Sequence, residues 1–190
     1  MYKQKWKINY NSPVILTYAL LSLVIVGLGY LTGGMTTRAF FTLMPNFSLT
    51  NLARMFTYVL GHANFAHFFG NFSIILLVGP LIEEKYGSKN LLIMIGFTAF
   101  VTALIQILLF NSALIGASGI AFLLILLSPF TKRQAKTIPL TFVFILVMYL
   151  GREVFDAFVV RDNVSQFAHI LGGLIGAGFG MILEPGKRHI

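Results

Sequence analysis

Residues 116–130 read GASGIAFLLILLSPF, and the rest of the chain can be interpreted around them. One serine, Ser118, stands between small residues at the start of an apolar run that stops at Pro129. A helix over 118–130 is too short to cross a hydrocarbon core about 30 Å thick at about 1.5 Å per residue. A helix that starts inside a membrane implies a water-filled cavity, because irregular backbone at that depth is tolerated only there. The tetrad alone is weak evidence, because small residues are also common wherever membrane helices pack closely, and packing is its default interpretation.

The composition predicts an all-helical membrane protein. Of 190 residues, 57% are hydrophobic and 11% are charged, whereas a soluble domain has about 25% charged residues. We expect one domain over residues 1–190, with no room for a separate soluble domain. The chain has no cysteine, which excludes disulfides, cysteine nucleophiles and cysteine metal sites.

Apolar runs predict six spans, with a short central fourth helix. A basic start followed by an apolar run resembles a signal peptide, but the run is long enough to span and no small-x-small cleavage site follows, so we expect a retained first helix. Residues 35–64 are expected to form an interfacial, partly helical loop, and residues 152–164 a polar outer loop. The spans are expected at about 13–32, 65–82, 90–110, 118–130, 138–151 and 165–183.

Charge predicts the orientation of these spans. With six spans, ten of the 14 basic residues lie on the side of the two tails: Lys3, Lys5, Lys7, Lys85, Lys89, Lys132, Arg133, Lys136, Lys187 and Arg188. Arg38, Arg54, Arg152 and Arg161 lie opposite. The positive-inside rule then places both termini in the cytoplasm, and we expect a bacterial inner membrane. The net charge of +8 is therefore interpreted as a topology signal and not as a nucleic-acid surface.

Four polar side chains are expected at one depth. Counted from the tail side of each helix, Ser118 lies about 18 Å up, His169 about 21 Å, Asn71 about 16 Å and His67 about 22 Å. Polar residues inside spans are functional hypotheses by default. Three separate helices thus deliver polar groups to one layer.

This layer has the chemistry of acyl transfer. A serine hydroxyl needs a neighbouring base, and His169 is the candidate, since imidazole titrates near neutral pH. With Asp156 and Asp162 assigned to the outer loop, the arrangement is a Ser–His dyad. The Ser118 N–H, the Asn71 amide and a ring N–H of His67 are candidate oxyanion donors. One face of the last span carries His169, Gly172 or Gly173, Gly176 and Gly180, and we expect it to pack against Gly119.

Four pieces of sequence carry a family resemblance: His62-x4-His67-x3-Asn71, Glu83-x3-Gly87-Ser88, Gly116-x-Ser118-Gly119, and Ala168-His169-x2-Gly172-x3-Gly176. In this order, over roughly residues 50–180, they resemble the rhomboid family of intramembrane serine proteases in its compact six-span bacterial form. The sequence departs from that pattern at Ala53-Arg54, where members often have Trp-Arg, and at Phe122, where many have Tyr. We expect the Phe122 ring to stack on His169.

The resemblance implies a nucleophile at Ser118 with His169 as its base. It implies an oxyanion hole of Asn71, His67 and the Ser118 N–H, and the close approach there is suited to Gly116. It also implies a lateral gate near the second and fifth spans and a mobile cap over 152–164. Substrates would be single-span membrane proteins in the lipid bilayer, with no metal, cofactor or nucleic acid involved; the oligomeric state stays open.

Other interpretations remain at this point. A catalytically inactive rhomboid-like protein would bind membrane clients, and a small transporter or channel would need repeated halves. A zinc site formed by His62, His67 and His169 is a further interpretation, although no HExxH motif is present. Ser118 could be a packing residue, Asn71 an interhelical hydrogen-bonding residue, and His62 a structural contact in its loop. Glu83 and Gly87 are expected to shape the turn between the second and third spans.

Overall fold

The computed structural model describes residues 9–132, 137–159 and 163–183, and these are mainly helical. The basic residues of both tails, with Arg133, Lys136 and Arg161, lie outside the described residues. Glycines end or begin several helices, and Pro13 opens the first, where its fixed φ suits helix entry. The elements are α1 (Pro13–Leu31), α2 (Met35–Phe40), α3 (Leu49–Thr57), η1 (Tyr58–Leu60), α4 (Phe65–Tyr86), α5 (Ser88–Leu109), α6 (Ser118–Leu127), η2 (Ser128–Lys132), α7 (Leu140–Val159) and α8 (Asn163–Ile182).

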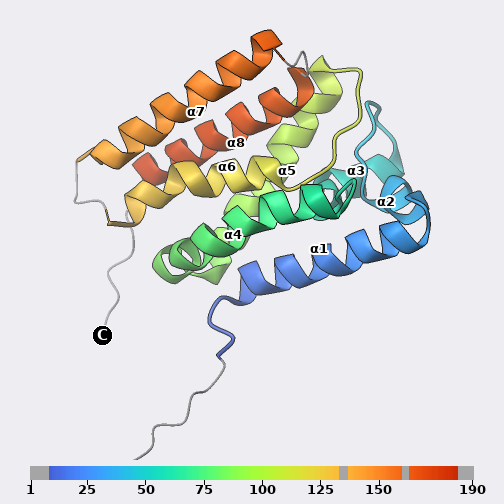
Figure 1. The fold of residues 1–190 in the computed structure, drawn as a ribbon, viewed down its shortest axis with the longest axis horizontal. Helices are drawn as coiled ribbons and strands as arrows, with labels where there is room; N and C mark the ends of the chain where they lie inside the picture. Colours follow the sequence, from blue (N-terminus) through green and yellow to red (C-terminus); the bar gives the residue numbers. More distant parts are fainter. Residues whose placement is uncertain (1–8, 133–136, 160–162, 184–190) are drawn as a thin grey trace, which may run out of the picture.

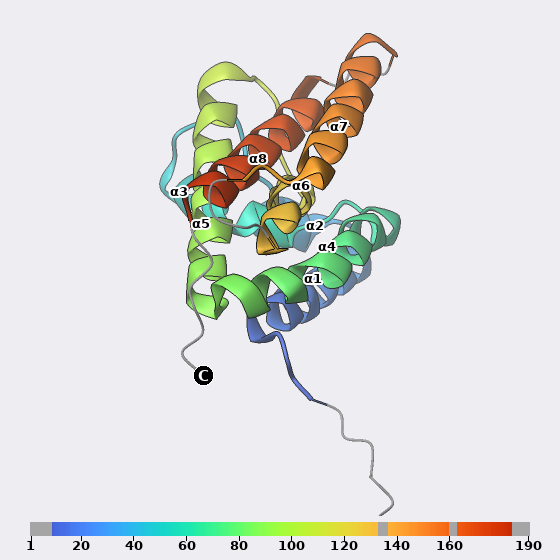
Figure 2. The same ribbon diagram turned by 90° about the vertical axis from the view of Figure 1, so that its left-hand side faces the viewer.

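The longer helices form a bundle around α6. In Figure 1, α1, α4, α6, α7 and α8 lie side by side, and α4, α6 and α8 run in the direction opposite to α1 and α7. The turned view shows α5 upright along one side of this row, at the left of the picture, with α1 and α7 at its opposite outer ends (Figure 2). We call the side on which α1 begins and α8 ends the terminal side.

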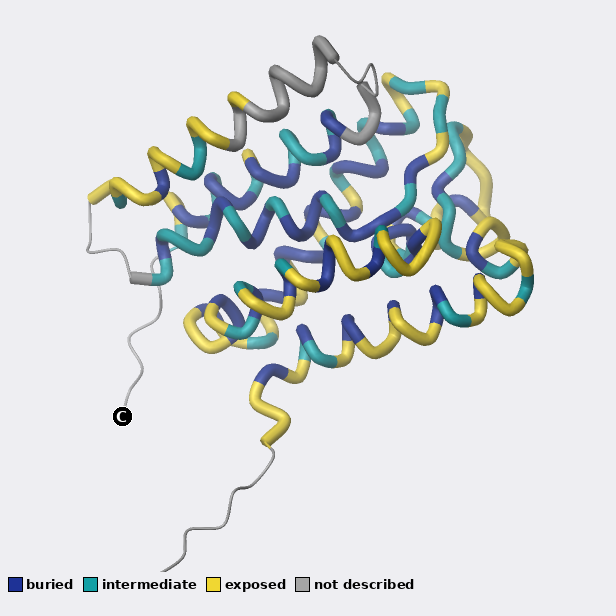
Figure 3. Tube along the Cα trace, in the orientation of Figure 1, coloured by how far each residue is buried: buried dark blue, intermediate teal, exposed yellow. Residues whose placement is uncertain are grey.

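Burial follows this arrangement. Of the α6 side chains, Leu123, Leu124, Leu126 and Leu127 are fully buried, and α6 is dark along most of its length in Figure 3. By contrast, large apolar side chains on α1 and α7, such as Val24 and Val147, are more than half exposed. A helix that is apolar all round and buried belongs at the centre, whereas exposed apolar faces suit contact with lipid.

Within the described residues, three helices are long and apolar enough to cross a membrane: α1, α4 and α5. Two shorter apolar helices cover Ser118–Thr131 and Gln166–Ile182. The expected helical class is thereby confirmed for the described residues, and three of these helices have the length and composition of membrane spans. The expected short helix after Ser118 is also present, because α6 with η2 ends at Lys132.

Two helices continue past the residues at which their spans were expected to stop. The second was expected to stop at 82, but α4 continues to Tyr86 and ends at Gly87, whose φ of 84° is left-handed. The fifth was expected to stop at 151 before a polar loop, but α7 continues to Val159. Charge does not end a helix, since Arg and Glu are good helix formers. Much of the expected cap over 152–164 is therefore helical, and 160–162 lie outside the described residues.

The segment 35–64 is a folded, partly helical loop, as expected. Ser48 caps α3 by accepting from the Asn51 N–H, and the Asn51 amide bonds Met44 and Asn46. Arg54 Nε donates to the Ala39 carbonyl at 3.2 Å, which ties α3 to α2 without a preceding tryptophan. This loop places η1 and residues 61–64 directly before α4.

Candidate active site

The start of α6 is held by backbone hydrogen bonds. Leu43 and Leu114 exchange two bonds of 2.9 and 3.0 Å, and the Gly116 N–H donates to the Tyr58 carbonyl at 3.0 Å. Gly116 has φ +117°, a conformation that side chains rarely permit. Ser118 follows as the first residue of α6 and is half-buried. First-turn N–H groups have no partner within their own helix, so this end offers donors.

The α6–α8 contact is the most extensive between any two described elements. Glycines make it possible: a Cβ at Gly172 would overlap the Gly119 carbonyl, and one at Gly176 the Leu123 carbonyl. Farther along α8, a Cβ at Gly180 would overlap the Phe130 ring of η2. A Cβ at Gly119 would lie 3.3 Å from the Ala168 carbonyl oxygen. The expected packing of the last helix through its glycine face is confirmed. Ser118 and His169 directly follow or precede the residues in this contact.

His169 lies against the aromatic ring one turn after Ser118. The ring centroids of Phe122 and His169 are 4.5 Å apart with a 44° tilt. Aromatic rings prefer such offset or tilted contacts. The expected contact is therefore present without a tyrosine hydroxyl, and it fixes the imidazole on the face of α6 that begins at Ser118.

On the other side of α6, α4 presents His67 and Asn71. A Cβ at Gly116 would lie 2.6 Å from His67 Cε1, 2.8 Å from His67 Nε2 and 3.7 Å from Asn71 Nδ2. Both side chains thus converge on the backbone just before Ser118, and only glycine leaves room for them. Asn64 caps α4 by accepting from the His67 N–H at 2.8 Å, which places His67 in the first turn.

His62 joins these groups, although the sequence analysis predicted only a structural contact in its loop. It is 1% exposed, and its Nε2 lies 3.2 Å from Asn71 Nδ2 and 3.4 Å from the Ala117 nitrogen. Its Nδ1 lies 3.3 Å from the Leu60 carbonyl oxygen, and its ring centroid 5.0 Å from that of His67. The structural contact predicted for His62 is present, and its partners, Asn71 and Ala117, belong to the candidate site. Its position in the His62-x4-His67-x3-Asn71 pattern was the available signal.

These contacts define the protonation of His62. Because a carbonyl only accepts, Nδ1 carries the proton, and Nε2 then accepts from both Asn71 and Ala117. Burial, followed by the neighbouring His67, lowers the pKa of His62 to about 4, against a partial rise from the Leu60 carbonyl. His62 is therefore neutral near pH 7 and acts as an acceptor that orients two donors.

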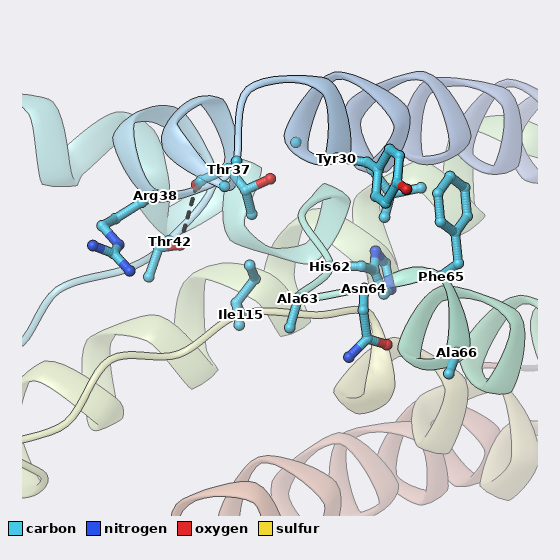
Figure 4. A pocket seen from close by; sticks show the side chains of 14 residues that line it. Tyr30, Thr37, Arg38, Thr42, His62, Ala63, Asn64, Phe65, Ala66 and Ile115 are labelled. Carbon is cyan, nitrogen blue, oxygen red and sulfur yellow. Dashed lines mark hydrogen bonds between the residues drawn. The ribbon is translucent and has the colours of Figure 1, made fainter.

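A cavity of about 660 Å³ opens beside this group. Its lining comes from the end of α1, from α2, from residues 62–66 and from Ile115, the residue before Gly116. Figure 4 shows His62, Ala63 and Ile115 near its centre, with Arg38 at one end and Tyr30 beside Phe65 at the other. The cavity brings open space to within one residue of Gly116.

Within the part of the chain that the structure describes, no group of three or more His, Cys, Asp or Glu side chains could hold a metal ion. His62 and His67 are neighbours, but His169 contacts α6 from the opposite side through Phe122. The geometry gives no support to the zinc interpretation.

The fold and the motif pattern agree with a comparison to known families. The Rhomboid domain profile matches residues 49–185, well over half of the chain. The chain belongs to the rhomboid family, as the motifs predicted. Membership of this family, together with the apolar helices, identifies the chain as a multi-pass helical membrane protein. No curated protein matches the chain significantly.

Proposed function

We propose that the protein is an intramembrane serine endopeptidase with Ser118 as nucleophile and His169 as general base. The observation that carries the proposal is the α6–α8 contact. It holds His169 against Phe122, one turn from Ser118, while Asn71 and His67 approach Gly116 from the other side. A nucleophile, a base and donors for an oxyanion are the parts that acyl transfer needs.

The chemistry would run in two halves. Ser118 Oγ attacks the scissile carbonyl as His169 takes its proton, and the carbonyl oxygen becomes an oxyanion. The Ser118 N–H, the second amide hydrogen of Asn71 and His67 would stabilise that charge. His169 then protonates the leaving amine, which leaves an acyl-enzyme. Water, deprotonated by His169, attacks the ester, and the carboxylate product departs as Ser118 regains its proton.

His62 gives Asn71 a defined role in this scheme. One amide hydrogen of Asn71 is directed to His62 Nε2, so the other is held in a fixed direction. A preorganised donor stabilises a developing charge better than one that must reorient. The cavity beside Ile115 is the space we assign to substrate residues next to the scissile bond.

The same proposal extends to topology. Six helices, α1 and α4–α8, alternate in direction (Figure 1), and we assign each as a span, with the short α6 starting at mid-depth. Both termini would then lie in the cytoplasm of a bacterium. Substrates would be single-span membrane proteins that enter laterally near α4 and α7.

The test compares the full-length wild type with Ser118→Ala and His169→Ala in detergent or proteoliposomes. A single-span protein labelled at both ends serves as substrate. We expect cleavage by the wild type and a loss of at least about 10³-fold in either variant, because the two residues act as a unit. A fluorophosphonate probe should label Ser118 only when His169 is intact.

Two results would decide against the proposal. Cleavage that persists in Ser118→Ala would place the nucleophile elsewhere. A wild type that neither cuts nor reacts with the probe, yet retains the substrate during purification, would establish an inactive client-binding protein.

A further inference from the structure

The cavity beside the candidate active site has a cation in its lining. Arg38 borders the same space of about 660 Å³ as His62 of the candidate site and Ile115, and Figure 4 shows it at one end of that space. Burial lowers the pKa of His62 to about 4, so this imidazole is neutral near pH 7. Among the described lining residues, Arg38 is therefore the one formal charge.

The backbone around Arg38 is fixed on both sides. Before it, the buried Thr37 lies so close to α1 that a Cβ at Gly29 would overlap its Oγ1. After it, the Ala39 carbonyl accepts from Arg54 Nε at 3.2 Å. The fold thus sets the position of Arg38, and its side chain alone is left to adjust.

The guanidinium group of Arg38 is exposed and has no hydrogen bond or ion pair with any other described residue. Glu83 and Glu84, the two acids whose side chains are described, lie near the far end of α4, whereas the cavity is bordered by Phe65 and Ala66 at its start. The side chains of the other four acids lie outside the described residues. No described carboxylate neutralises this cation.

A fixed guanidinium beside open space suits a carboxylate. Its planar fork of N–H donors matches the two oxygens of an Asp or Glu side chain. The α2 helix that carries Arg38 follows the end of α1 that lies opposite the terminal side, which is the outer side in the proposed topology. The outer flank of a membrane span is poor in Lys and Arg, so an acid there meets few competing cations on its own chain.

The size of the cavity limits how far such an acid can lie from the scissile bond. A compact space of about 660 Å³ is about 11 Å across, and an extended peptide covers that length in about three residues at about 3.3 Å each. Ile115, the residue before Gly116, borders this space together with Arg38. An acid that reaches Arg38 from the scissile bond is therefore about three residues away from it.

We propose that Arg38 is a specificity-determining residue that binds an Asp or Glu side chain in the outer flank of the substrate, about three residues from the scissile bond. The inference rests on the proposed function, because it assigns the cavity to the substrate. Arg38 selects among substrates and takes no part in breaking the bond. The competing partner for its charge is a lipid phosphate, which would leave the choice of substrate unchanged.

The test measures binding before cleavage. Full-length Ser118→Ala in detergent is titrated with fluorescent single-span peptides that carry one Asp, or Asn as the matched control, at successive positions of an otherwise uncharged outer flank. At the best position we expect Asp to bind about fivefold more tightly than Asn, which is the size of an ion pair that water still reaches. Cleavage by the wild type, followed by mass spectrometry of the products, should place the scissile bond about three residues from that position.

Charge variants in the Ser118→Ala background identify the residue responsible. Arg38→Gln should reduce the ratio of the Asn to the Asp dissociation constant to about one, and Arg38→Glu should favour a peptide with Lys at that position. Lys85→Gln is the matched control, because Lys85 is also an exposed cation but lies near the far end of α4. It should keep the preference for Asp.

The outcomes separate this inference from the proposed function. Equal affinity for the Asp and Asn peptides at every position, or a preference that survives Arg38→Gln, would overturn the inference, as would a loss of bound phospholipid in Arg38→Gln with an unchanged peptide preference. Equal cleavage of both peptides by the wild type would reject the inference and keep the protease. A preference for Asp without any cleavage by the wild type would reject the protease and keep Arg38 as the residue that selects a bound client.

Discussion

His62 is the residue through which two elements of the candidate site are aligned. Its Nε2 accepts from the Asn71 amide on α4 and from the Ala117 N–H beside α6. It contacts no position we assign to the reacting atoms, so its role in the proposed chemistry is positioning. A buried acceptor with two donors leaves both donors unsatisfied when it is removed, which costs about 1–3 kcal/mol for each group.

We predict that His62→Ala lowers kcat by about tenfold or more with little change in KM, because a misdirected Asn71 donor weakens binding of the transition state more than of the substrate. His62→Gln can place an amide oxygen near the position of Nε2 and should recover part of the rate. Kinetics on the labelled substrate measure both parameters. A rise in KM at constant kcat in His62→Ala would instead assign His62 to substrate binding.

The lowered pKa of His62 predicts a pH dependence of stability. Unfolded, the imidazole has a pKa of about 6.5, and folded it is about 4, so the unfolded state binds more protons between these values. The contribution is fully present above about pH 6.5 and is lost as pH falls toward 4, up to about 3 kcal/mol.

We therefore expect Tm in detergent to be flat above pH 7 and to fall between pH 6.5 and 4. His62→Gln, which does not titrate, should show a shallower fall when its curve is compared with that of the wild type. Parallel curves for the two proteins would mean that other groups cause the acid sensitivity.

At the scale of elements, α6 and α8 pack through backbone contact. The Gly172 and Gly176 positions face the carbonyls of Gly119 and Leu123 with no space for a methyl group. Apolar helices in a membrane gain no hydrophobic free energy when they exchange lipid for one another. Their association therefore depends on close packing, which small residues allow. That distance also sets how far His169 lies from the start of α6.

We predict that Gly172→Ala destabilises the protein by about 1–3 kcal/mol, as overpacking does, and reduces cleavage because α8 is displaced from Ser118. Gly178→Ala is the control: its Cβ meets nothing within 4 Å, and alanine favours a helix. Thermal unfolding and cleavage are measured together. Wild-type behaviour in Gly172→Ala would show that α8 can shift without cost.

At the scale of the whole molecule, Glu83 connects three helices. Its carboxylate accepts from the Val14 and Ile15 N–H groups at 2.9 and 3.1 Å and from Ser88 Oγ at 2.7 Å. Ser12 precedes α1 but makes no side-chain cap, so a residue of α4 caps α1 instead. Nearby, Gly79 allows Ile15 to lie directly on α4.

We predict that Glu83→Gln lowers stability by about 1.5–3 kcal/mol, because charged acceptors make the stronger hydrogen bonds and an amide offers one acceptor oxygen in place of two. Glu84→Gln, at the exposed neighbouring position, should change stability by less than about 0.5 kcal/mol. Unfolding curves of the three proteins provide the comparison. An equal loss of stability at both positions would mean that Glu83 contributes no more to stability than an exposed charge does.

The sequence by itself determined the helical class, the short helix after Ser118, the glycine face of α8 and the candidate residues Ser118, His169, Asn71 and His67. These follow from apolar runs and from helical periodicity, which depend on residues close together in the chain. The order of these residues along the chain pointed to the rhomboid family, and the family match over residues 49–185 confirms that membership.

Only the tertiary structure decided what His62 and Glu83 bind and that α7 continues past residue 151. His62 and Ala117 are 55 residues apart, and Glu83 and Val14 are 69 apart. No local pattern predicts such pairs. A polar side chain in an apolar segment needs a hydrogen-bond partner, but the sequence around it does not identify that partner. The partner is fixed by the packing of α1, α4 and α6 against one another.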